Sequence, residues 1–486
     1  MQRSPGFLPL RGLHPGLFCI ALSALKKMHL ELWIHAVIDA NLQSDEEFRR
    51  FAGQDSFRFP SRTGVETYQL YKLRQTIRTC LKDSAFYREL FGNALALPEN
   101  IRDLTRLPFT EPRHLSENPY RFLCTSQAQI ARPYTFITSG TTGPKKKIFW
   151  TQNDLDRITD FMAAGIGTVA NPGDSVLILL PDGRPNSQSD LLRQGVLKLG
   201  AKPFVANVDL TALELLEAIE ESRCRIIFGY TRKIFRLSKE LERHQNLRVR
   251  GVEVLFLAAE YLPGAMRQEL KRLWNCDIRT HYGLTEMGLG VAVECEAHDG
   301  LHFNEADLLL EIVHPETGAP VPAGEEGELV FTTLTREAMP LIRYRTHDLS
   351  RRVSDSCICG AASLLKIDTV KKRLEAIATI GDGDEIYPAL FDDVLFEIPG
   401  VVDYQVIATK AVGEAGEFGM DRLDFKVEMV PDQAGGISEI RRKLLSAPII
   451  AKNLSAQKML EPGIELVAWG GLQSVGRAKK MLIDRR

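Results

Sequence analysis

Residues 138–147 read TSGTTGPKKK, a stretch in which hydroxyl side chains and glycines are followed at once by three lysines. Backbone amides of a glycine-rich turn can point together at an anion, and Ser and Thr hydroxyls add further donors. Gly140 and Gly143 allow the backbone to approach a phosphate group closely. The stretch differs from the G-x-x-x-x-G-K-[ST] loop, so it predicts a phosphate-binding loop of another kind. The alternative is a polar loop with a basic surface.

The chain after this loop alternates between short apolar runs and helical patterns. SVLILL (175–180), RIIFGY (225–230) and VEVLFLAAE (252–260) are typical of buried strands, and LTALELLEAIEES (210–222) is typical of a helix. Strands that alternate with helices predict a parallel α/β sheet.

The pattern changes near residue 308. LLLEIVHPETGAPVPAGEEGELVFTTLT (308–335) predicts two strands around Pro- and Gly-rich turns, and therefore a smaller antiparallel unit. After about residue 370 the chain is typical of a separate α+β domain. FDDVLFEIPG (391–400) predicts a short helix there, and VVDYQVIA (401–408) and LDFKVEMV (423–430) predict strands.

Composition limits the classes of function. The chain has 486 residues, of which 44% are hydrophobic and 26% charged, as in a soluble globular protein of two to four domains. Its net charge of -2 argues against a nucleic-acid partner. No apolar run reaches the length of about 18 residues that a membrane span needs, so no membrane partner is expected. The eight cysteines are mostly scattered, which suits a reducing, cytoplasmic location.

The N-terminal region divides near Met28. Residues 1–27, MQRSPGFLPLRGLHPGLFCIALSALKK, predict a disordered extension or a start codon assigned too early. A weak signal peptide is the alternative, but no small-x-small cleavage site follows cleanly. From Met28 the sequence is helix-like, and residues 67–92 carry Leu and Ile at helical spacing up to a stop at Gly92.

TSGTTG followed by Pro and Lys resembles the phosphate-loop signature of the adenylate-forming enzymes, the acyl-CoA synthetases and their relatives. The usual spacing is G-x-P-K, whereas this chain has G-P-K-K, so Lys146 takes the usual lysine position. The resemblance implies nucleotide contacts from Thr138, Ser139, Gly140, Thr141, Thr142, Gly143 and Lys146, with Lys146 also acting in catalysis.

Three further motifs of this superfamily follow in the same order. HYGLTE (281–286) matches Y-G-x-T-E, which implies that Tyr282, Gly283 and Thr285 contact the nucleotide. Glu286 would then help to hold Mg²⁺ as a catalytic residue. LAAEYL (257–262) resembles the element that lines the adenine pocket, which implies roles for Ala259 and Glu260.

RYRTHDL (343–349) resembles Y-R-T-G-D-L, whose Asp binds the ribose hydroxyls. Asp348 takes that position. His347 replaces the usual Gly, and nothing in the sequence explains the replacement.

Longer stretches resemble the phenylacetate–CoA ligases. YKLRQTIRTCLKDSAFYRELF, LTRLPFTEPRHL and the segment from GLHFNEAD to LIRYRT are similar to that group, and GDEIYP (383–388) resembles a small-domain element. The resemblance covers roughly residues 65–486. It implies an ATP-dependent carboxylate–CoA ligase that forms an acyl-CoA through an acyl adenylate, releasing AMP and pyrophosphate. ATP, Mg²⁺ and CoA are the implied cofactors, and a small carboxylic acid, aromatic by analogy, is the implied substrate. We also expect a homodimer.

The same resemblance implies the domain organisation. We expect a large multi-layer α/β N-terminal domain with a small β-barrel-like subunit over 28–368, and a small mobile α+β C-terminal domain over 374–486. The hinge between them is expected at 369–373, where relatives carry Gly-Arg near Lys372 and Arg373. Arg373 is expected at the nucleotide.

SVGRAKK (474–480) carries a departure from the family, in which Gly-Lys is usual and the lysine bridges the substrate carboxylate and the α-phosphate. Arg477 takes that catalytic position here, with the charge of lysine but a different shape. Arg477 does the lysine's work less well, or Lys479 or Lys480 reaches in, or adenylation is impaired. The sequence leaves these three possibilities open.

Cys295, His302, Cys357 and Cys359 form a candidate metal site. Two thiolates one residue apart, with a distant Cys and His, suit tetrahedral Zn²⁺ in a structural role. Some phenylacetate–CoA ligase relatives carry this arrangement. His298 is a competing ligand, and ordinary thiols near a turn are the alternative.

Two other functions remain open. The chain could transfer AMP or the acyl group to an acceptor other than CoA, such as a deazaflavin coenzyme, or it could bind a nucleotide or acyl-CoA without turnover. The acyl pocket is expected near Tyr230 and the segment 281–290, although the acid itself cannot be identified from sequence.

Overall fold

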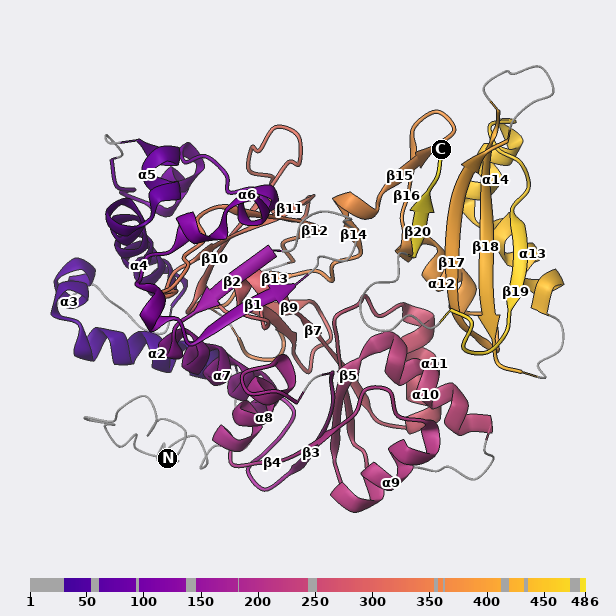
Figure 1. The fold of residues 1–486 in the computed structure, drawn as a ribbon, viewed down its shortest axis with the longest axis horizontal. Helices are drawn as coiled ribbons and strands as arrows, with labels where there is room; N and C mark the ends of the chain where they lie inside the picture. The colour runs from indigo at the N-terminus through magenta and orange to yellow at the C-terminus, as the bar shows by residue number, and fades with distance from the viewer. Residues whose placement is uncertain are drawn as a thin grey trace, which may run out of the picture.

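The computed structural model describes residues 30–53, 61–92, 96–136, 146–181, 183–243, 251–353, 357–361, 363–411, 419–431, 436–472 and 481–486. The predicted extension at 1–27, the phosphate loop at 138–143 and the segment with Arg477 lie outside the described residues. Figure 1 shows the N-terminal helices at one end, the main sheet in the centre and the C-terminal α+β unit at the other end.

The N-terminal part is helical. It consists of α2 (Leu30–Ser44), α3 (Glu46–Ala52), α4 (Arg62–Asp83) and α5 (Ala85–Phe91). The helical pattern of 67–92 therefore covers two helices rather than one. Ser84 divides them, because its backbone N–H closes α4 on the carbonyl of Cys80 while its side chain accepts a hydrogen bond from the amide of Tyr87 in α5.

The central sheet has eight strands in the order β13-β9-β8-β7-β6-β5-β3-β4. Their bounds are β3 (Ser175–Leu179), β4 (Lys202–Ala206), β5 (Ile226–Tyr230), β6 (Val254–Ala258), β7 (Asp277–Tyr282), β8 (Ala292–Glu294), β9 (Leu301–Phe303) and β13 (Lys366–Ile367). The strands from β7 to β4 are parallel, and β8, β9 and β13 join them antiparallel. The predicted parallel α/β core is confirmed.

Both faces of the parallel part are covered by helices. Along β3, Val176 and Ile178 pack in the cluster that includes α7 (Gln152–Gly167) and α8 (Gln188–Lys198). Leu177 and Leu179 pack instead with α9 (Ala212–Ser222), α10 (Thr231–Arg243) and α11 (Gly264–Trp274). Successive strand residues point to opposite faces, so a strand covered on both sides requires an unbroken apolar run.

A second, antiparallel sheet lies beside the first. Its order is β10-β11-β12-β14, with β10 (Leu308–Val313), β11 (Glu326–Thr333), β12 (Tyr344–Arg351) and β14 (Lys372–Arg373). A separate pair is formed by β1 (Arg132–Phe136) and β2 (Lys146–Trp150), and α6 (Pro112–Glu117) precedes it. The smaller antiparallel unit predicted from 308–335 is therefore present.

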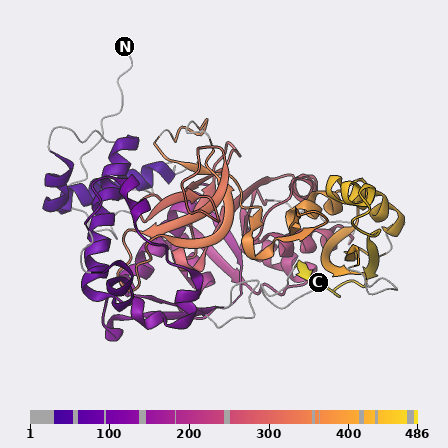
Figure 2. The ribbon, with the colours of Figure 1, turned by 90° about the horizontal axis from the view of Figure 1, so that it is seen from above.

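The C-terminal unit contains β17 (Val401–Lys410), β18 (Asp421–Met429), β19 (Gly463–Val467) and β20 (Leu482–Asp484) in the order β19-β18-β17-β20. The pair β15 (Ala378–Ile380) and β16 (Asp384–Ile386) precedes this sheet, and α12 (Pro388–Phe396), α13 (Gly436–Ser446) and α14 (Pro448–Ser455) pack with it. Seen from above, this unit lies at the opposite end from the N-terminal helices (Figure 2).

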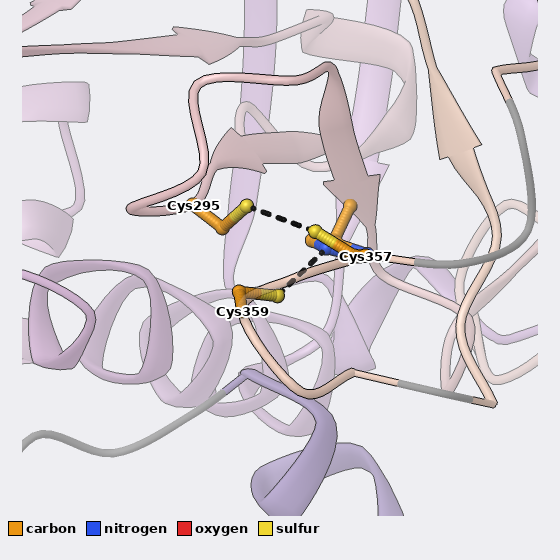
Figure 3. Close-up of side chains that lie close together, drawn as sticks. Cys295, Cys357 and Cys359 are labelled. Atoms are coloured by element: carbon orange, nitrogen blue, oxygen red, sulfur yellow. Dashed lines mark hydrogen bonds between the residues drawn. The ribbon is translucent and has the colours of Figure 1, made fainter.

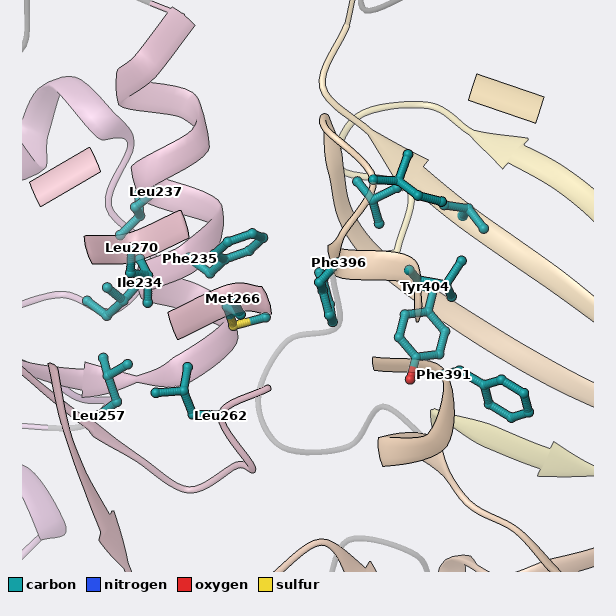
Figure 4. Packing of buried hydrophobic residues seen from close by; sticks show 14 of the residues in the cluster. Ile234, Phe235, Leu237, Leu257, Leu262, Met266, Leu270, Phe391, Phe396 and Tyr404 are labelled. Atoms are coloured by element: carbon teal, nitrogen blue, oxygen red, sulfur yellow. The ribbon is translucent and has the colours of Figure 1, made fainter. Parts of the chain in front are cut away.

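One apolar cluster joins α10 and α11 to the C-terminal unit. The rings of Phe235 and Phe396 meet edge to face across this boundary, with their centroids 5.5 Å apart (Figure 4). The ring of Phe396 also lies 5.9 Å from that of Tyr404. Ion pairs surround the apolar contact, with Arg232 reaching Asp392 at 2.8 Å and Asp403 at 3.1 Å. Among the described helices, none is long and apolar enough to cross a membrane.

Candidate active site

Lys146, Glu286 and Tyr344 form a buried polar triangle. They come from the start of β2, from the 3-10 turn Thr285–Met287 and from the start of β12. The Lys146 ammonium lies 3.2 Å from Glu286 Oε1 and 3.2 Å from the Tyr344 hydroxyl, which donates to the same carboxylate oxygen at 2.7 Å. Burial raises the pKa of Tyr344 well above its usual value, so the phenol keeps its proton and donates. Sequence reasoning missed Tyr344, whose only signal is its place in RYRT.

Asp348 lies beside this triangle in β12. Its Oδ2 accepts a hydrogen bond of 2.6 Å from the Tyr282 hydroxyl, and its Oδ1 is 2.9 Å from Arg373 Nε. The strands explain the second contact, because Asp348 and Arg373 are partners in the register of β12 and β14. Burial raises the pKa of Asp348, and the charge of Arg373 and the Tyr282 bond oppose that rise. Asp348 thus contacts both Tyr282 and Arg373, and all three are residues that the sequence places at the nucleotide.

The turn after β7 brings the HYGLTE motif into place. A Cβ at Gly283 would lie 2.2 Å from the Leu289 carbonyl oxygen, so this approach of two backbones requires glycine. Gly288 and Leu289 have positive φ values of 91° and 71°, which reverse the chain towards β8. Thr285 and Glu286 are buried on this turn.

Ala259 and Glu260 follow β6 at the carboxyl edge of the parallel strands, the edge at which α/β sheets bind ligands. Ala259 has a φ of 74°, a left-handed conformation that alanine rarely adopts. The Glu260 carboxylate accepts a hydrogen bond of 2.9 Å from the Arg232 amide. That contact fixes the loop against α10.

An apolar pocket lies next to the HYGLTE turn. Leu289, Gly290 and His281 of the segment 281–290 line it, whereas Tyr230 is not among its lining residues. Phe228 and Phe256 of the neighbouring strands line it instead, together with Phe161 and Met162 of α7. These side chains lie far apart in the sequence, and only the packing of α7 on the sheet brings them together.

Comparison with known proteins places this arrangement in a family. Residues 111–334 match the family described as AMP-binding enzyme. The phenylacetate-coenzyme A ligase of Aromatoleum evansii is 30% identical over 445 residues, which cover 88% of this chain and 96% of that protein. The chain belongs to the phenylacetate–CoA ligase family. The predicted resemblance and the predicted class of enzyme, an AMP-forming acid–thiol ligase, are confirmed.

Other relatives support the same assignment. The phenylacetate-coenzyme A ligase of Thermus thermophilus is 30% identical over 384 residues, covering 76% of this ligase and 82% of the relative. Among solved structures, a 2-hydroxyisobutyryl-CoA ligase described as being in the postadenylation state with 2-HIB-AMP has a TM-score of 0.74 at 21% identity. It covers 88% of this ligase and 91% of its own chain, so the two share the fold across both units.

The candidate metal residues of the ligase also converge. Ligand atoms of Cys295, His302, Cys357 and Cys359 all lie within 4.8 Å of one another. Cys295 Sγ is 3.5 Å from Cys357 Sγ, and Cys359 Sγ is 3.4 Å from His302 Nε2 (Figure 3). Tetrahedral zinc with bonds of about 2.0–2.3 Å needs ligand atoms roughly 3.3–3.8 Å apart, and the two distances above lie in that range, so the donor set fits Zn²⁺.

The competing ligand His298 is engaged elsewhere. Its Nδ1 lies 2.9 Å from Glu294 and its Nε2 lies 3.1 Å from Asp277. His298 is therefore outside the four-residue group, and His302 is the histidine that belongs to it.

Proposed function

We propose that this ligase joins a small apolar carboxylic acid to CoA, and that the buried group Lys146, Glu286, Asp348 and Arg373 is its nucleotide site. The observation that carries this assignment is the contact between Lys146 and Glu286, which are 140 positions apart and belong to two separate motifs. An ammonium beside a carboxylate suits a triphosphate, because the first offsets phosphate charge and the second is a ligand for a divalent cation.

The reaction has two halves. A carboxylate oxygen attacks the α-phosphorus of ATP, a P–O bond to pyrophosphate breaks, and an acyl adenylate forms. The CoA thiol then attacks the acyl carbon, loses its proton, and AMP leaves with the bonding electron pair. Activation is required because a carboxylate is a poor electrophile, and the protein contributes positioning and charge stabilisation.

The residues take separate parts in this scheme. Lys146 would hold phosphate oxygens from the start of β2, and Glu286 would hold Mg²⁺, which neutralises phosphate charge when bound. Asp348 would accept hydrogen bonds from the ribose hydroxyls, since an ionised carboxylate only accepts. Arg373 of β14 contacts the Asp348 carboxylate. A bound ribose would therefore share that carboxylate with Arg373 or displace Arg373 from it.

The acyl group would occupy the cavity between α7 and the HYGLTE turn. Apolar side chains dominate its wall, and burial of an apolar acyl group there is favourable. The relatives named for phenylacetate make an aryl acid the first candidate. The Cys₃His group would hold one structural Zn²⁺, because all four ligand positions come from the protein and leave none open for chemistry. A cytoplasmic homodimer remains our expectation.

A pyrophosphate-release screen over aryl, fatty and hydroxy acids, with and without CoA, tests this function. We expect release that depends on the acid, and AMP release that depends on CoA. Acid-dependent pyrophosphate without a CoA thioester would favour another acceptor. No release with any acid, together with ATP binding, would favour a binding protein without turnover.

Arg477 is tested separately. We expect Arg477→Ala to abolish adenylate formation and to spare thioester formation from supplied acyl adenylate, and Arg477→Lys to retain both. If Lys479→Ala or Lys480→Ala stops adenylation while Arg477→Ala does not, one of those lysines does the work instead.

A further inference from the structure

His347 stands in an unfavourable backbone conformation. Its φ is 62°, in the left-handed region where glycine is at ease and a side chain costs of order 1 kcal/mol or more. This is the position at which the related motif carries glycine. The energetic cost of this backbone conformation is offset by contacts of the residue, which points to the contacts of the imidazole.

Each ring nitrogen of His347 faces a different carboxylate. Nδ1 lies 3.3 Å from Glu375 Oε1, and Nε2 lies 3.9 Å from Glu111 Oε2. A neutral imidazole has one N–H, whereas the imidazolium has two and can donate to both sides. The backbone amide of His347 is also held, because it donates to Glu328 at 2.9 Å.

The two carboxylates lie on either side of the expected hinge. Glu111 is the N-cap residue of α6, which belongs to the large domain. Glu375 lies in the 3-10 turn Leu374–Ala376, directly after β14, where the small domain is expected to begin. His347 itself precedes Asp348, whose partner Arg373 ends β14. The imidazole thus bridges the two sides beside the nucleotide site.

We propose that His347 is a positioning residue whose imidazolium ties Glu375, at the start of the small domain, to Glu111 of the large domain. This inference rests on the proposed function, because it matters only if the small domain changes its orientation between the half-reactions. In the arrangement seen, the tie keeps β14 against β12 and Arg373 on Asp348. Rotation about 369–373 carries Glu375 away and breaks it.

The surrounding charges keep the ring protonated. Glu111, Glu328 and Glu375 face it, and Arg345 lies among them, 3.7 Å from Glu111 and also paired with Glu328. His114 acts on Glu111, Lys146 and Arg373 act on Glu375, and Asp348 adjoins the ring. The carboxylates of Glu111 and Glu375, which face the two ring nitrogens, raise the pKa of His347 from 6.5 to about 9, against the effect of burial. The tie is therefore complete below about pH 6.5 and is lost as the pH rises through about 9.

Limited trypsin digestion tests the tie without any substrate. Lys371, Lys372 and Arg373 are trypsin sites within the expected hinge. We expect His347→Gly and Glu375→Gln to speed cleavage there roughly three- to fivefold at pH 7.5, the size of effect expected for a partly exposed ion pair. Above pH 9, the cleavage rate of the unsubstituted ligase should approach that of the variants.

Gln457→Gly is the control, because it relieves an exposed left-handed residue with a φ of 55°. Its cleavage rate should match that of the unsubstituted ligase.

A functional readout accompanies the digestion. In both variants, the ratio of the rate of adenylate formation to the rate of thioester formation from supplied acyl adenylate should change by about three- to fivefold. Unchanged cleavage in both variants, or faster cleavage with an unchanged ratio, overturns the proposal. If no acid supports turnover, the proposed function fails, while the digestion still decides whether the tie exists.

Discussion

At the proposed nucleotide site, each buried charged group is stabilised by its partners. Lys146 is only 9% exposed at its side chain and Glu286 only 2%. A single charge in such a place would be costly, whereas a hydrogen-bonded pair offsets much of that cost. The Tyr344 hydroxyl completes the group by donating to the Glu286 carboxylate. The three side chains thus satisfy one another's hydrogen bonds and charges.

Tyr344→Phe tests this view of the triangle. The ring stays and one hydrogen bond to a carboxylate is lost, so the free energy of unfolding should fall by about 1.5–3 kcal/mol. Denaturant unfolding measures the change. Tyr120→Phe, at a ring that is 49% exposed, is the matched control and should have little effect. Equal stability of the two variants would contradict the assigned bond.

Asp348→Ala tests ribose binding. Loss of a charge-assisted hydrogen bond costs about 1.5–3 kcal/mol, which corresponds to a rise in the ATP requirement of an order of magnitude or more. The dependence of pyrophosphate release on ATP concentration measures it. Asp382→Ala, at a side chain that is 79% exposed, is the control. ATP dependence like that of the control would remove Asp348 from the site.

At the scale of elements, short turns and connections position the side chains of both candidate sites. The 3-10 turn after β7 holds Glu286, and Gly283 permits it because a Cβ there would meet the Leu289 carbonyl. Cys295 follows β8, His302 lies in β9, and the segment at 357–359 supplies the other two members of the Cys₃His group. Further along the chain, β13 pairs with β9. A metal in this place would join the end of the large domain to the antiparallel edge of its main sheet.

Zinc analysis tests this part of the structure. Purified ligase should contain about one Zn²⁺ per chain, and the double variant Cys357→Ser with Cys359→Ser should lose the metal and melt at a lower temperature. Cys276→Ser, at a cysteine outside the group, should keep both metal and melting temperature. Metal-free protein with the melting temperature of the unsubstituted ligase would rule out a structural ion.

At the scale of the whole molecule, the two units share a boundary that is apolar at its centre and charged at its margin. Arg232 of α10 lies over the rings of Phe396 and Tyr404, 5.1 Å and 5.5 Å from their centroids, while it pairs with Asp392 and Asp403. Its side chain is 16% exposed. Ion pairs of this kind make an interface specific, yet they can be replaced by water when the units separate, as a domain rotation would require.

Arg232→Ala should weaken this boundary. Asp392 would stay buried without its cation and Asp403 would keep only Arg236, at 3.8 Å, a loss of about 3–5 kcal/mol for a buried pair. Thermal unfolding should show the C-terminal unit melting earlier. Combining Arg232→Ala with Asp392→Asn and Asp403→Asn should recover part of the loss, because the uncompensated charges are then gone. Additive losses in the combined variant would mean that the three residues do not act together.

Contiguous motifs could be interpreted from the sequence alone. Glu286, Asp348 and the glycine-rich loop each belong to a short string whose chemistry is local. The strands at 175–180 and 252–260 could be predicted because burial on both faces requires continuous apolar runs. The Cys-x-Cys pair also indicated a metal, although the choice between His298 and His302 stayed open.

Tertiary structure decided the contacts between distant residues. Arg373 meets Asp348 because β14 pairs with β12, and Tyr344 meets Lys146 because β12 begins beside the start of β2. The apolar pocket beside the HYGLTE turn forms because α7 packs on the central sheet. His302 joins the four-residue group, whereas Glu294 and Asp277 engage His298. The role we propose for His347 could not be inferred from the RYRTHDL motif, because its two carboxylate partners lie 236 positions before it and 28 positions after it. Such contacts depend on strand order and burial, which local sequence patterns do not encode.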